Sequence, residues 1–484
     1  MTGANVQPGV GNEGVNRTSA RPVPPLSAHA PPVGLPLRFF GVGLLSVVGL
    51  PVGILLRPEV LATYHYNQFV IALTHLTVLG WMGSVVFGAL YQLVPVVLGT
   101  RLYSGRLAHW HFVCHLVGFA GMVWMFWRWD PKQVGHFGSV LALGVGLCVW
   151  NLVRTVLRAP RRTWMSVVVL SSLFWWGAVV TVGLGVAAAK CTYESAARLD
   201  PTTPLGALVH ALESTATYLR RFDPIALMHA HAHLGLVGAF LILLVGVSYQ
   251  LVPMFTLGPA PSPRRVLGVW ALLNLATAGS FLTILHRSPW KLCFTGIGLV
   301  ALAGYGWDLA QVLRRRKRPE LDFAMRYFLT GLAWLIPLGG LALYLSWPGL
   351  VLTARVGQWE NVYGLWALTG LFTFCLLGML YKIVPFLAWY RWYAPWVGLR
   401  PVPALHELYR GGWLRTGYGL HMAAVLGWTL GALASHTQWV RAGALLFAAA
   451  MMLHAVNLGW VWVRRAEPAE RAAGVPEPRW RSAS

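Results

Sequence analysis

The sequence has few charged side chains and very few acidic ones. Only 11% of its 484 residues are charged, 15 acidic against 38 basic, whereas 56% are hydrophobic. The mean hydropathy is +0.58. Such a composition is typical of polytopic membrane proteins and excludes an ordinary soluble domain. The net charge of +23 does not predict nucleic-acid binding, because the basic residues gather in loops between apolar runs, where they set topology and meet lipid headgroups.

Cysteine motifs are also missing. The five cysteines are scattered and form neither C-x-x-C nor C-x-x-C-H, which argues against a covalently attached c-type haem and against a thiolate zinc site. Residues 1–37 are rich in Pro, Gly, Asn and Ser and have no apolar core, so we expect a disordered cytoplasmic tail and no cleavable signal peptide.

What the chain does have is a succession of apolar stretches near the ~20 residues that cross a bilayer as a helix. The sequence therefore predicts an all-α polytopic membrane protein of about twelve transmembrane helices. Their expected ranges are 38–56, 69–99, 107–128, 135–158, 163–189, 227–257, 264–286, 290–314, 324–346, 361–389, 413–434 and 438–464.

Basic residues concentrate in alternate loops, for example in 314-RRRKR-318, while the intervening loops are poorer in them. By the positive-inside rule, the basic loops and both termini are cytoplasmic, including a basic tail over 465–484. We expect the protein in the cytoplasmic (inner) membrane of the cell, in contact with the lipid bilayer.

Three of the predicted helices share one pattern, G-x7-G-x2-Y-[QK]-[LI]-V-P. It occurs in HLTVLGWMGSVVFGALYQLVP (75–95), HLGLVGAFLILLVGVSYQLVP (233–253) and LWALTGLFTFCLLGMLYKIVP (365–385). The copies are offset by 158 and 132 residues, with four spans in each period. This internal repeat predicts a membrane domain over 38–464 built from three pseudo-symmetric four-helix units, 38–158, 163–314 and 324–464, with the patterned helices inside.

The first position of the repeat indicates the chemistry. It is His75, then His233, then Leu365. Ionisable residues within a membrane usually face the bundle interior and are functional, and a b-type haem needs neutral imidazoles at matched height. We therefore expect His75 and His233 to be the two axial ligands of one haem b. The alternative is that each imidazole only bonds a helix carbonyl within a glycine-lined interface.

Two more histidines precede His233 in the run 229-HAHAH-233. At about 100° per residue, His229 shares a face with His233 and His231 points to the other side. An H-x-H helix can thus serve two sites, and His231 is a candidate ligand of a second, five-coordinate haem. For His231, a position at the water interface fits equally. His229 completes the candidate metal ligands, but we favour an interfacial position for it.

Two arginines just before this run, Arg220 and Arg221, are candidate partners for haem propionates, because guanidinium pairs carboxylates with two hydrogen bonds. An exposed loop pair is the alternative.

The remaining histidines have less definite roles. His111 and His115 share a face and could bind a metal, but we favour an interfacial position for them. On the outer side, five histidines are the plausible supply for a copper ion: His65, His136, His210, His286 and His436. From the second span on we expect no well-buried carboxylate, with Asp308 near a cytoplasmic end.

The run HAHLGLVGAFLILLVGVSYQLVPMF resembles the tenth helix of subunit I of the haem-copper oxidases, in which an H-x-H pair binds a high-spin and a low-spin haem. The run around His75 is similar to that family's second helix, and twelve helices with threefold pseudo-symmetry match its fold. YKIVPFLAWY resembles relatives of the C-type oxidases, and the NnrS family of twelve-span haem and copper proteins is a further distant resemblance.

The sequence departs from the oxidase pattern in places that matter for function. Its H-x-H helix lies in the second unit instead of the third, and neither a His-His pair nor an H-P-E-V-Y motif occurs. Copper is therefore unsupported, and an ordinary oxygen reductase is doubtful.

The resemblance implies one haem b, or two, in respiratory electron transfer or in the binding or reduction of O₂ or NO. A cytochrome c, a cupredoxin-like subunit or a quinol would be the electron donor, and the resemblance leaves open whether the protein is an oxidoreductase. Two alternatives remain: a membrane carrier or channel for a metal or small solute, and a non-catalytic haem-binding subunit or assembly factor.

Overall fold

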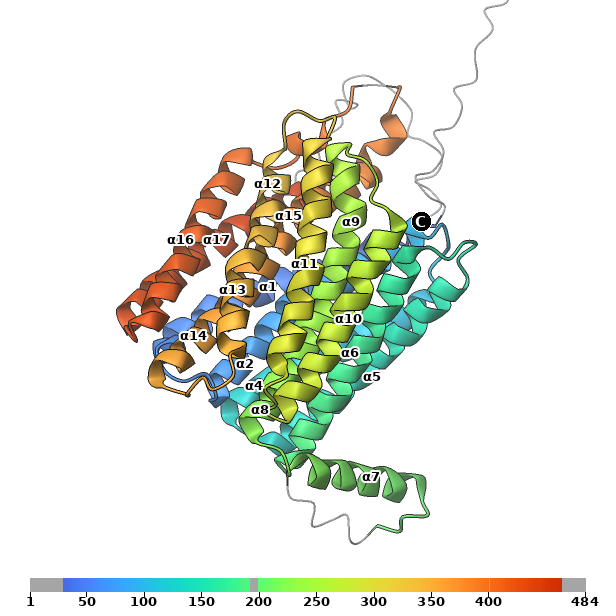
Figure 1. The fold of residues 1–484 in the computed structure, drawn as a ribbon. Helices are drawn as coiled ribbons and strands as arrows, with labels where there is room; N and C mark the ends of the chain where they lie inside the picture. The colour runs from blue at the N-terminus through green and yellow to red at the C-terminus, as the bar shows by residue number, and fades with distance from the viewer. Residues whose placement is uncertain (1–28, 192–198, 400, 464–484) are drawn as a thin grey trace, which may run out of the picture.

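A computed structural model of the chain describes residues 29–191, 199–399 and 401–463. Within these residues the fold consists of helices and connecting loops, with no β-strand, as the sequence predicts (Figure 1). Most of the predicted N-terminal tail and nearly all of the C-terminal tail lie outside the described residues. The first helix begins at Gly34 instead of residue 38.

The helices follow the predicted order. The first predicted unit contains α1 (Gly34–Leu56), the continuous helix α2–η2–α3 (Gln68–His75, Leu76–Gly83, Ser84–Val97), α4 (Gly105–Arg128) and α5 (Pro131–Leu157). The second contains α6 (Trp164–Ala189), α8–η4–α9 (Pro224–His233, Leu234–Leu241, Ile242–Thr256), α10 (Pro263–Leu285) and α11 (Lys291–Arg314). The third contains α12 (Phe323–Ala333), α13 (Leu335–Ser346), α14–η5–α15 (Ala354–Leu365, Trp366–Phe372, Thr373–Trp392), α16 (Gly411–Leu433) and α17 (Thr437–Val463).

One further helix, α7 (Pro204–Leu219), lies in the long loop between α6 and α8 and projects from one end of the bundle (Figure 1). Helices α12 and α13 form one span that is interrupted at Trp334. Pro337 lacks the N–H that would bond the carbonyl of Ala333, which explains the interruption there.

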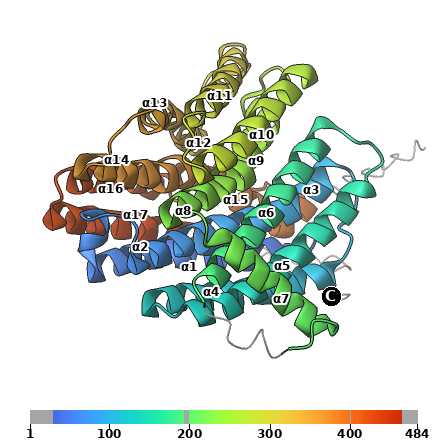
Figure 2. The ribbon, with the colours of Figure 1, turned by 60° about the horizontal axis from the view of Figure 1, so that its bottom comes forward.

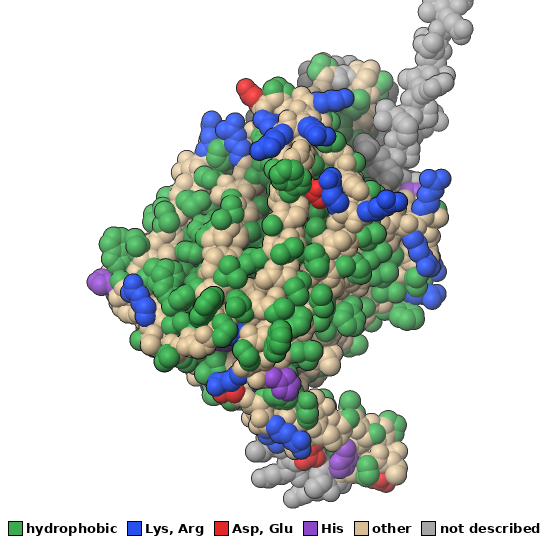
Figure 3. Space-filling model, in the orientation of Figure 1, with side chains coloured by type: hydrophobic (Ala, Val, Ile, Leu, Met, Phe, Trp, Pro, Cys, Tyr) green, Lys and Arg blue, Asp and Glu red, His purple; other side chains and the backbone are tan. Residues whose placement is uncertain are grey.

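Eleven described helices are long and apolar enough to cross a membrane. The predicted eleventh span, 413–434, corresponds to α16, whose 23 residues pack along α17 but are not among these candidates. Apolar side chains cover the flank of the bundle, and most of the visible Lys and Arg gather at its upper end (Figure 3). The prediction of a polytopic all-α membrane protein is confirmed; which end is cytoplasmic stays a prediction.

The three patterned helices form the interior of the bundle. In the spans that contain α2–α3, α8–α9 and α14–α15, 56%, 67% and 78% of the apolar window is buried, against at most 44% in any other span. Figure 2 shows α8 near the middle, with α4, α11 and α16 at the periphery. The repeat therefore marks the helices that build the core.

The repeat glycines let each central helix approach the first helix of its own unit. A Cβ at Gly88 would lie 2.8 Å from the ring of Phe40 on α1. At Gly246 it would lie 2.2 Å from Val168 on α6, and at Gly378 2.7 Å from the backbone nitrogen of Phe328 on α12. Small residues at helix interfaces are how membrane helices approach closely.

The repeat tyrosines tie each central helix to a later helix of its unit. The hydroxyl of Tyr91 is 2.9 Å from Nδ1 of His111, and that of Tyr381 is 3.0 Å from Nδ1 of His454. In the second unit Tyr249 donates to Asp308 at 3.1 Å. A buried phenol needs a partner, and each unit supplies a different one.

A π-helical segment follows the first position of every repeat copy. Leu76–Gly83, Leu234–Leu241 and Trp366–Phe372 begin directly after His75, His233 and Leu365. Such bulges are rare in helices and frequently mark functional sites. Here they occur at one depth in all three central helices.

The glycine contacts lead to a stability prediction. Gly378→Ala should lower the free energy of unfolding by about 1–3 kcal/mol, because the new Cβ meets the backbone of α12, which cannot move away as a side chain can. Gly340→Ala, on an open face of α13 with no atom within 4 Å of a new Cβ, is the matched control. Thermal unfolding in detergent should show a lower midpoint for Gly378→Ala alone; equal midpoints would contradict the packing described.

Candidate functional site

A cavity of about 960 Å³ lies between the three central helices and is lined mainly by apolar side chains. Five histidines line it: His65, His75, His229, His231 and His233. Large apolar cavities with a few convergent polar groups are the usual form of a cofactor site. The helices α2 and α8 supply four of these five histidines, and His65 lies in the loop before α2.

His75 and His233 are held in the same way. Nδ1 of His75 is 2.8 Å from the carbonyl oxygen of Ile71, and Nδ1 of His233 is 2.8 Å from that of His229. A carbonyl only accepts, so each imidazole carries its proton on Nδ1 and keeps Nε2 unprotonated. A second-shell carbonyl that orients a histidine in this way is the usual arrangement for a metal ligand.

On the α2 side, the ring of His75 packs against Phe126 of α4, with centroids 4.6 Å apart. His231 of α8 lines the same cavity. His231 also packs close to Gly183 of α6, where an added Cβ would lie 2.9 Å from its Cε1. Its buried Nδ1 has no hydrogen-bond partner among the described residues.

On the other side of α8, His233 stacks on Tyr363 of α14, with ring centroids 6.2 Å apart and planes inclined by 21°. In the repeat alignment, Tyr363 and His231 occupy the same position, two residues before Leu365 and His233. By this equivalence we expect His231 to face His75 at one interface of the ring, as Tyr363 faces His233 at the next. Sequence alignment matched the heights of His75 and His233 but not the direction in which each points.

The two predicted propionate partners are placed differently. Arg220 lines the cavity, and its guanidinium donates to the carbonyls of Ala189 and Cys191 at the end of α6. Arg221 is exposed and does not line the cavity. Sequence reasoning missed three other basic residues on the lining, namely Lys190, Arg287 and Lys291.

Near this basic end, His65 and His229 approach each other. Their Nε2 atoms are 2.9 Å apart, and Glu360 of α14 lies beside them with Oε2 4.0 Å from Nδ1 of His65. Burial lowers the pKa of His65 to about 4, so its imidazole is neutral at physiological pH. Burial and the charge of Glu360 raise the pKa of the neighbouring Tyr64 to about 12.

One buried carboxylate, Asp308, contradicts the expectation that these spans have none, and a second, Glu360, is partly buried. Glu360 was placed just before a span that starts at 361, but α14 begins at Ala354 and carries Glu360 inside it, with its side chain 21% exposed. Asp308 is only 3% exposed. The amphipathic first turns of α14 lack the apolar run that would have identified them as part of the span.

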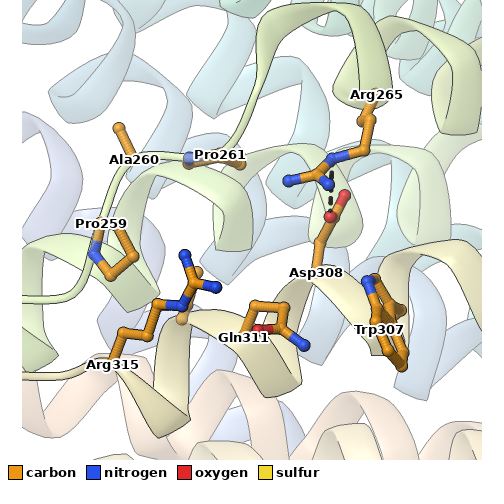
Figure 4. Close-up of a pocket in the computed structure, with 9 residues that line it drawn as sticks. Pro259, Ala260, Pro261, Arg265, Trp307, Asp308, Gln311 and Arg315 are labelled. Carbon is orange, nitrogen blue, oxygen red and sulfur yellow. Dashed lines mark ion pairs between the residues drawn. The ribbon is translucent and has the colours of Figure 1, made fainter.

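Asp308 belongs to a separate pocket of about 340 Å³ at the opposite, basic end (Figure 4). Its carboxylate forms an ion pair with Arg265, at 2.9 Å between Oδ1 and Nε, and accepts from Tyr249. The pocket's other polar side chains, Gln311 and Arg315, point toward the same opening (Figure 4). Both partners of Asp308 are structural, so we assign this group to stability.

Four more histidines are fully buried away from the cavity. His111 and His115 do not lie at the membrane interface as expected: they contact Tyr91 and Ser84, each at 2.9 Å. His421 and His454 share the hydroxyl of Tyr327, at 2.8 and 3.1 Å. All four join helices within their unit.

Comparison with known proteins agrees with the resemblance found in the sequence. The family described as "Cytochrome C and Quinol oxidase polypeptide I" matches residues 31–129. A cytochrome c oxidase subunit 1 homolog of Agrobacterium tumefaciens is 40% identical over 65 residues, which are 13% of this chain and 12% of the relative. Cytochrome c oxidase subunit 1 of Rhodobacter capsulatus is 31% identical over 136 residues, 22% of this chain and 26% of the relative.

These matches show a distant relationship to haem-copper oxidase subunit I. The matched segments cover about a quarter or less of the length of these relatives. The family match includes α2 and therefore His75.

The ion pair at Asp308 gives a prediction. Asp308→Asn keeps the shape of the side chain but removes the negative charge that pairs with Arg265 and accepts from Tyr249. The substitution should lower the free energy of unfolding by about 1.5–3 kcal/mol. Asp322→Asn is not a suitable control because Lys382 pairs with Asp322. Glu213→Gln, at a partly exposed position of α7 with no ion pair among the described residues, is suitable. Thermal unfolding should separate the two variants, and the haem or metal content of Asp308→Asn should match that of the wild type. A variant that loses bound cofactor would refute the structural assignment.

Proposed function

We propose that this distant relative of haem-copper oxidase subunit I is an integral membrane protein that binds two b-type haems in the cavity around α8. One observation supports this most: His75 and His233 are both fixed by an Nδ1 bond to a carbonyl, so that Nε2 is free on a side chain that lines a large apolar cavity. If each histidine served only to hydrogen-bond a helix carbonyl, its Nε2 would have no reason to face a large cavity.

We assign the first haem to the space between α2 and α8, with His75 and His231 as axial ligands. The sequence predicted His233 as the partner of His75, and that prediction is untested. Ring geometry favours His231, because equivalent positions of a threefold ring point the same way around it. Because His233 packs against Tyr363 of α14, the equivalent His75 is expected to face His231 of α8, which lines the same cavity. The unpaired Nδ1 of His231 is consistent with a side chain whose partner is a bound group.

The second haem would lie between α8 and α14, with His233 as its single protein ligand. Here the position equivalent to His231 is Tyr363, a neutral phenol that is a much weaker ligand than imidazole. This haem would be five-coordinate and could bind a small ligand on its open side. When bound, the two groups would supply one-electron transfer and, at the open side, binding of O₂ or NO.

The chain's own residues would do the rest. Apolar walls from α4, α6 and α13 exclude water, and the two backbone carbonyls hold the ring nitrogens in one tautomer. Arg220, together with Lys190 and Lys291, supplies positive charge on the lining for propionates. A cytochrome c, a cupredoxin-like subunit or a quinol remains the proposed electron donor, from the resemblance alone.

The ligand assignment predicts different losses in three variants. His75→Ala and His231→Ala should each lose the low-spin, six-coordinate haem spectrum, while His233→Ala should keep it and lose the second haem. Reduced-minus-oxidised spectra and a pyridine haemochrome count on purified protein measure both. His136→Ala, on the exposed outer end of α5, removes an imidazole outside the cavity and should change neither.

The contrary results are equally specific. Loss of the low-spin spectrum in His233→Ala but not in His231→Ala would support the pairing predicted by sequence alignment. Wild-type protein without a Soret band would refute the proposal and favour a carrier.

The pocket between α8 and α14 allows a gain-of-ligand test. Tyr363→His should place an imidazole opposite His233 and convert the second haem to six-coordinate, so that carbon monoxide no longer shifts the reduced spectrum. Tyr363→Phe removes only the hydroxyl and should keep the carbon monoxide response. If both variants respond like wild type, Tyr363 is not opposite the ligand.

A further inference from the structure

We propose that His65, His229 and Glu360 form a non-haem binding site for a borderline divalent transition-metal ion such as Zn²⁺. The site lies on the same cavity but uses none of the proposed haem ligands. It neither requires haem nor rests on the proposed function.

The three side chains come from three segments that the fold brings together. His65 lies in the loop before α2, His229 in the second turn of α8 and Glu360 in the second turn of α14. One ligand atom from each lies within 4.8 Å of the others. Tetrahedral zinc with its ligands at about 2.0–2.2 Å needs ligand atoms spaced in this range, so only small shifts of the side chains would close the site.

The two imidazoles face each other through the same nitrogen. Their Nε2 atoms are 2.9 Å apart, and the rings are stacked with centroids 5.1 Å apart. Two neutral imidazoles can share one N–H, or both lone pairs can be directed at one cation. The hydrogen-bond partners of His65 determine whether its Nε2 carries a proton or a lone pair.

Asn361 fixes the tautomer of His65. Its amide nitrogen donates to the carbonyl of Thr63 at 2.6 Å, which turns Oδ1 toward His65. Nδ1 of His65 is 3.1 Å from that oxygen and must donate to it, so Nε2 holds a lone pair. Orientation of a ligating imidazole by a second-shell acceptor is a regular feature of metal sites.

Glu360 supplies a partly buried carboxylate that no Lys or Arg pairs with in the described part of the chain. Its Oε2 is a buried atom without a hydrogen-bond partner. The nearby Lys291 does not form an ion pair with it and instead donates to the carbonyl of Leu345 at 3.1 Å. A buried carboxylate is costly unless it is paired or coordinates a metal, and a divalent ion would meet this need.

The ligand set selects the class of metal. Two imidazoles and one carboxylate suit Zn²⁺ and its neighbours, whereas Ca²⁺ and Mg²⁺ prefer oxygen ligands alone. Three protein ligands leave a fourth position for water, and no fourth His, Cys, Asp or Glu of the described residues belongs to the cluster.

The test is equilibrium dialysis of the purified protein against Zn²⁺ alone, with bound metal measured by mass spectrometry. Wild type should bind one Zn²⁺ per chain more than the triple variant His65→Ala, His229→Ala, Glu360→Gln. Each single variant should lose this ion. His136→Ala and Glu213→Gln, which remove the same groups elsewhere on the outer side, should keep it.

Asn361→Ala leaves all three ligands in place and should weaken binding about 10–100-fold, by loss of the orienting contact. Gel filtration and a haem count on the same samples show whether each variant is folded, and separate a missing haem from a missing metal. Zinc binding of the wild type equal to that of the triple variant, or retained in His65→Ala and Glu360→Gln, would overturn the proposal.

Discussion

The fold's central feature is the way an imidazole is carried inside an apolar helix bundle. A buried histidine nitrogen must be bonded, and the cheapest partner within a helix is the carbonyl one turn earlier. His75 and His233 use that carbonyl through Nδ1. This bond leaves the lone pair of the other nitrogen, Nε2, for a different partner, and the helix sets the direction in which Nε2 points. The haem assignments proposed for the cavity follow from this constraint.

The three central helices carry the same repeat positions, so the same arrangement is available at each interface between them. In the repeat alignment the positions that would meet at the three interfaces are His75 and His231, His233 and Tyr363, and Leu365 and Leu73; His233 and Tyr363 are in ring contact. One scaffold thereby offers a site with two imidazoles, a site with one, and an apolar interface with none. The tyrosines of the repeat vary in a similar way, because Tyr91 and Tyr381 contact histidines while Tyr249 donates to Asp308.

Periodicity, charge and the repeat predict much of this architecture from sequence. They identify the spans, the inner helices and the importance of His75 and His233, because apolar length and repeated glycines leave direct traces in the chain. They do not predict which imidazoles are neighbours, since that depends on the rotation of each helix about its axis in the ring. Glu360 and Asn361 were missed because the first turns of α14 are polar and do not look like part of a span. The sequence did not predict the burial of His111, because its partner, Tyr91, lies on another helix.

The outer and inner parts of the cavity differ in chemistry. His65, His229 and Glu360 bring together ligand atoms for an ion at the end of the cavity that Lys190, Arg287 and Lys291 line, while the apolar depth between α2 and α8 suits a flat macrocycle. The most direct measurement of the central claim is an experimental density map of the purified protein in detergent or nanodiscs. We predict planar density between α2 and α8 with the rings of His75 and His231 on its two faces. Lipid or detergent chains in that space, with both imidazoles in contact only with protein, would contradict the account.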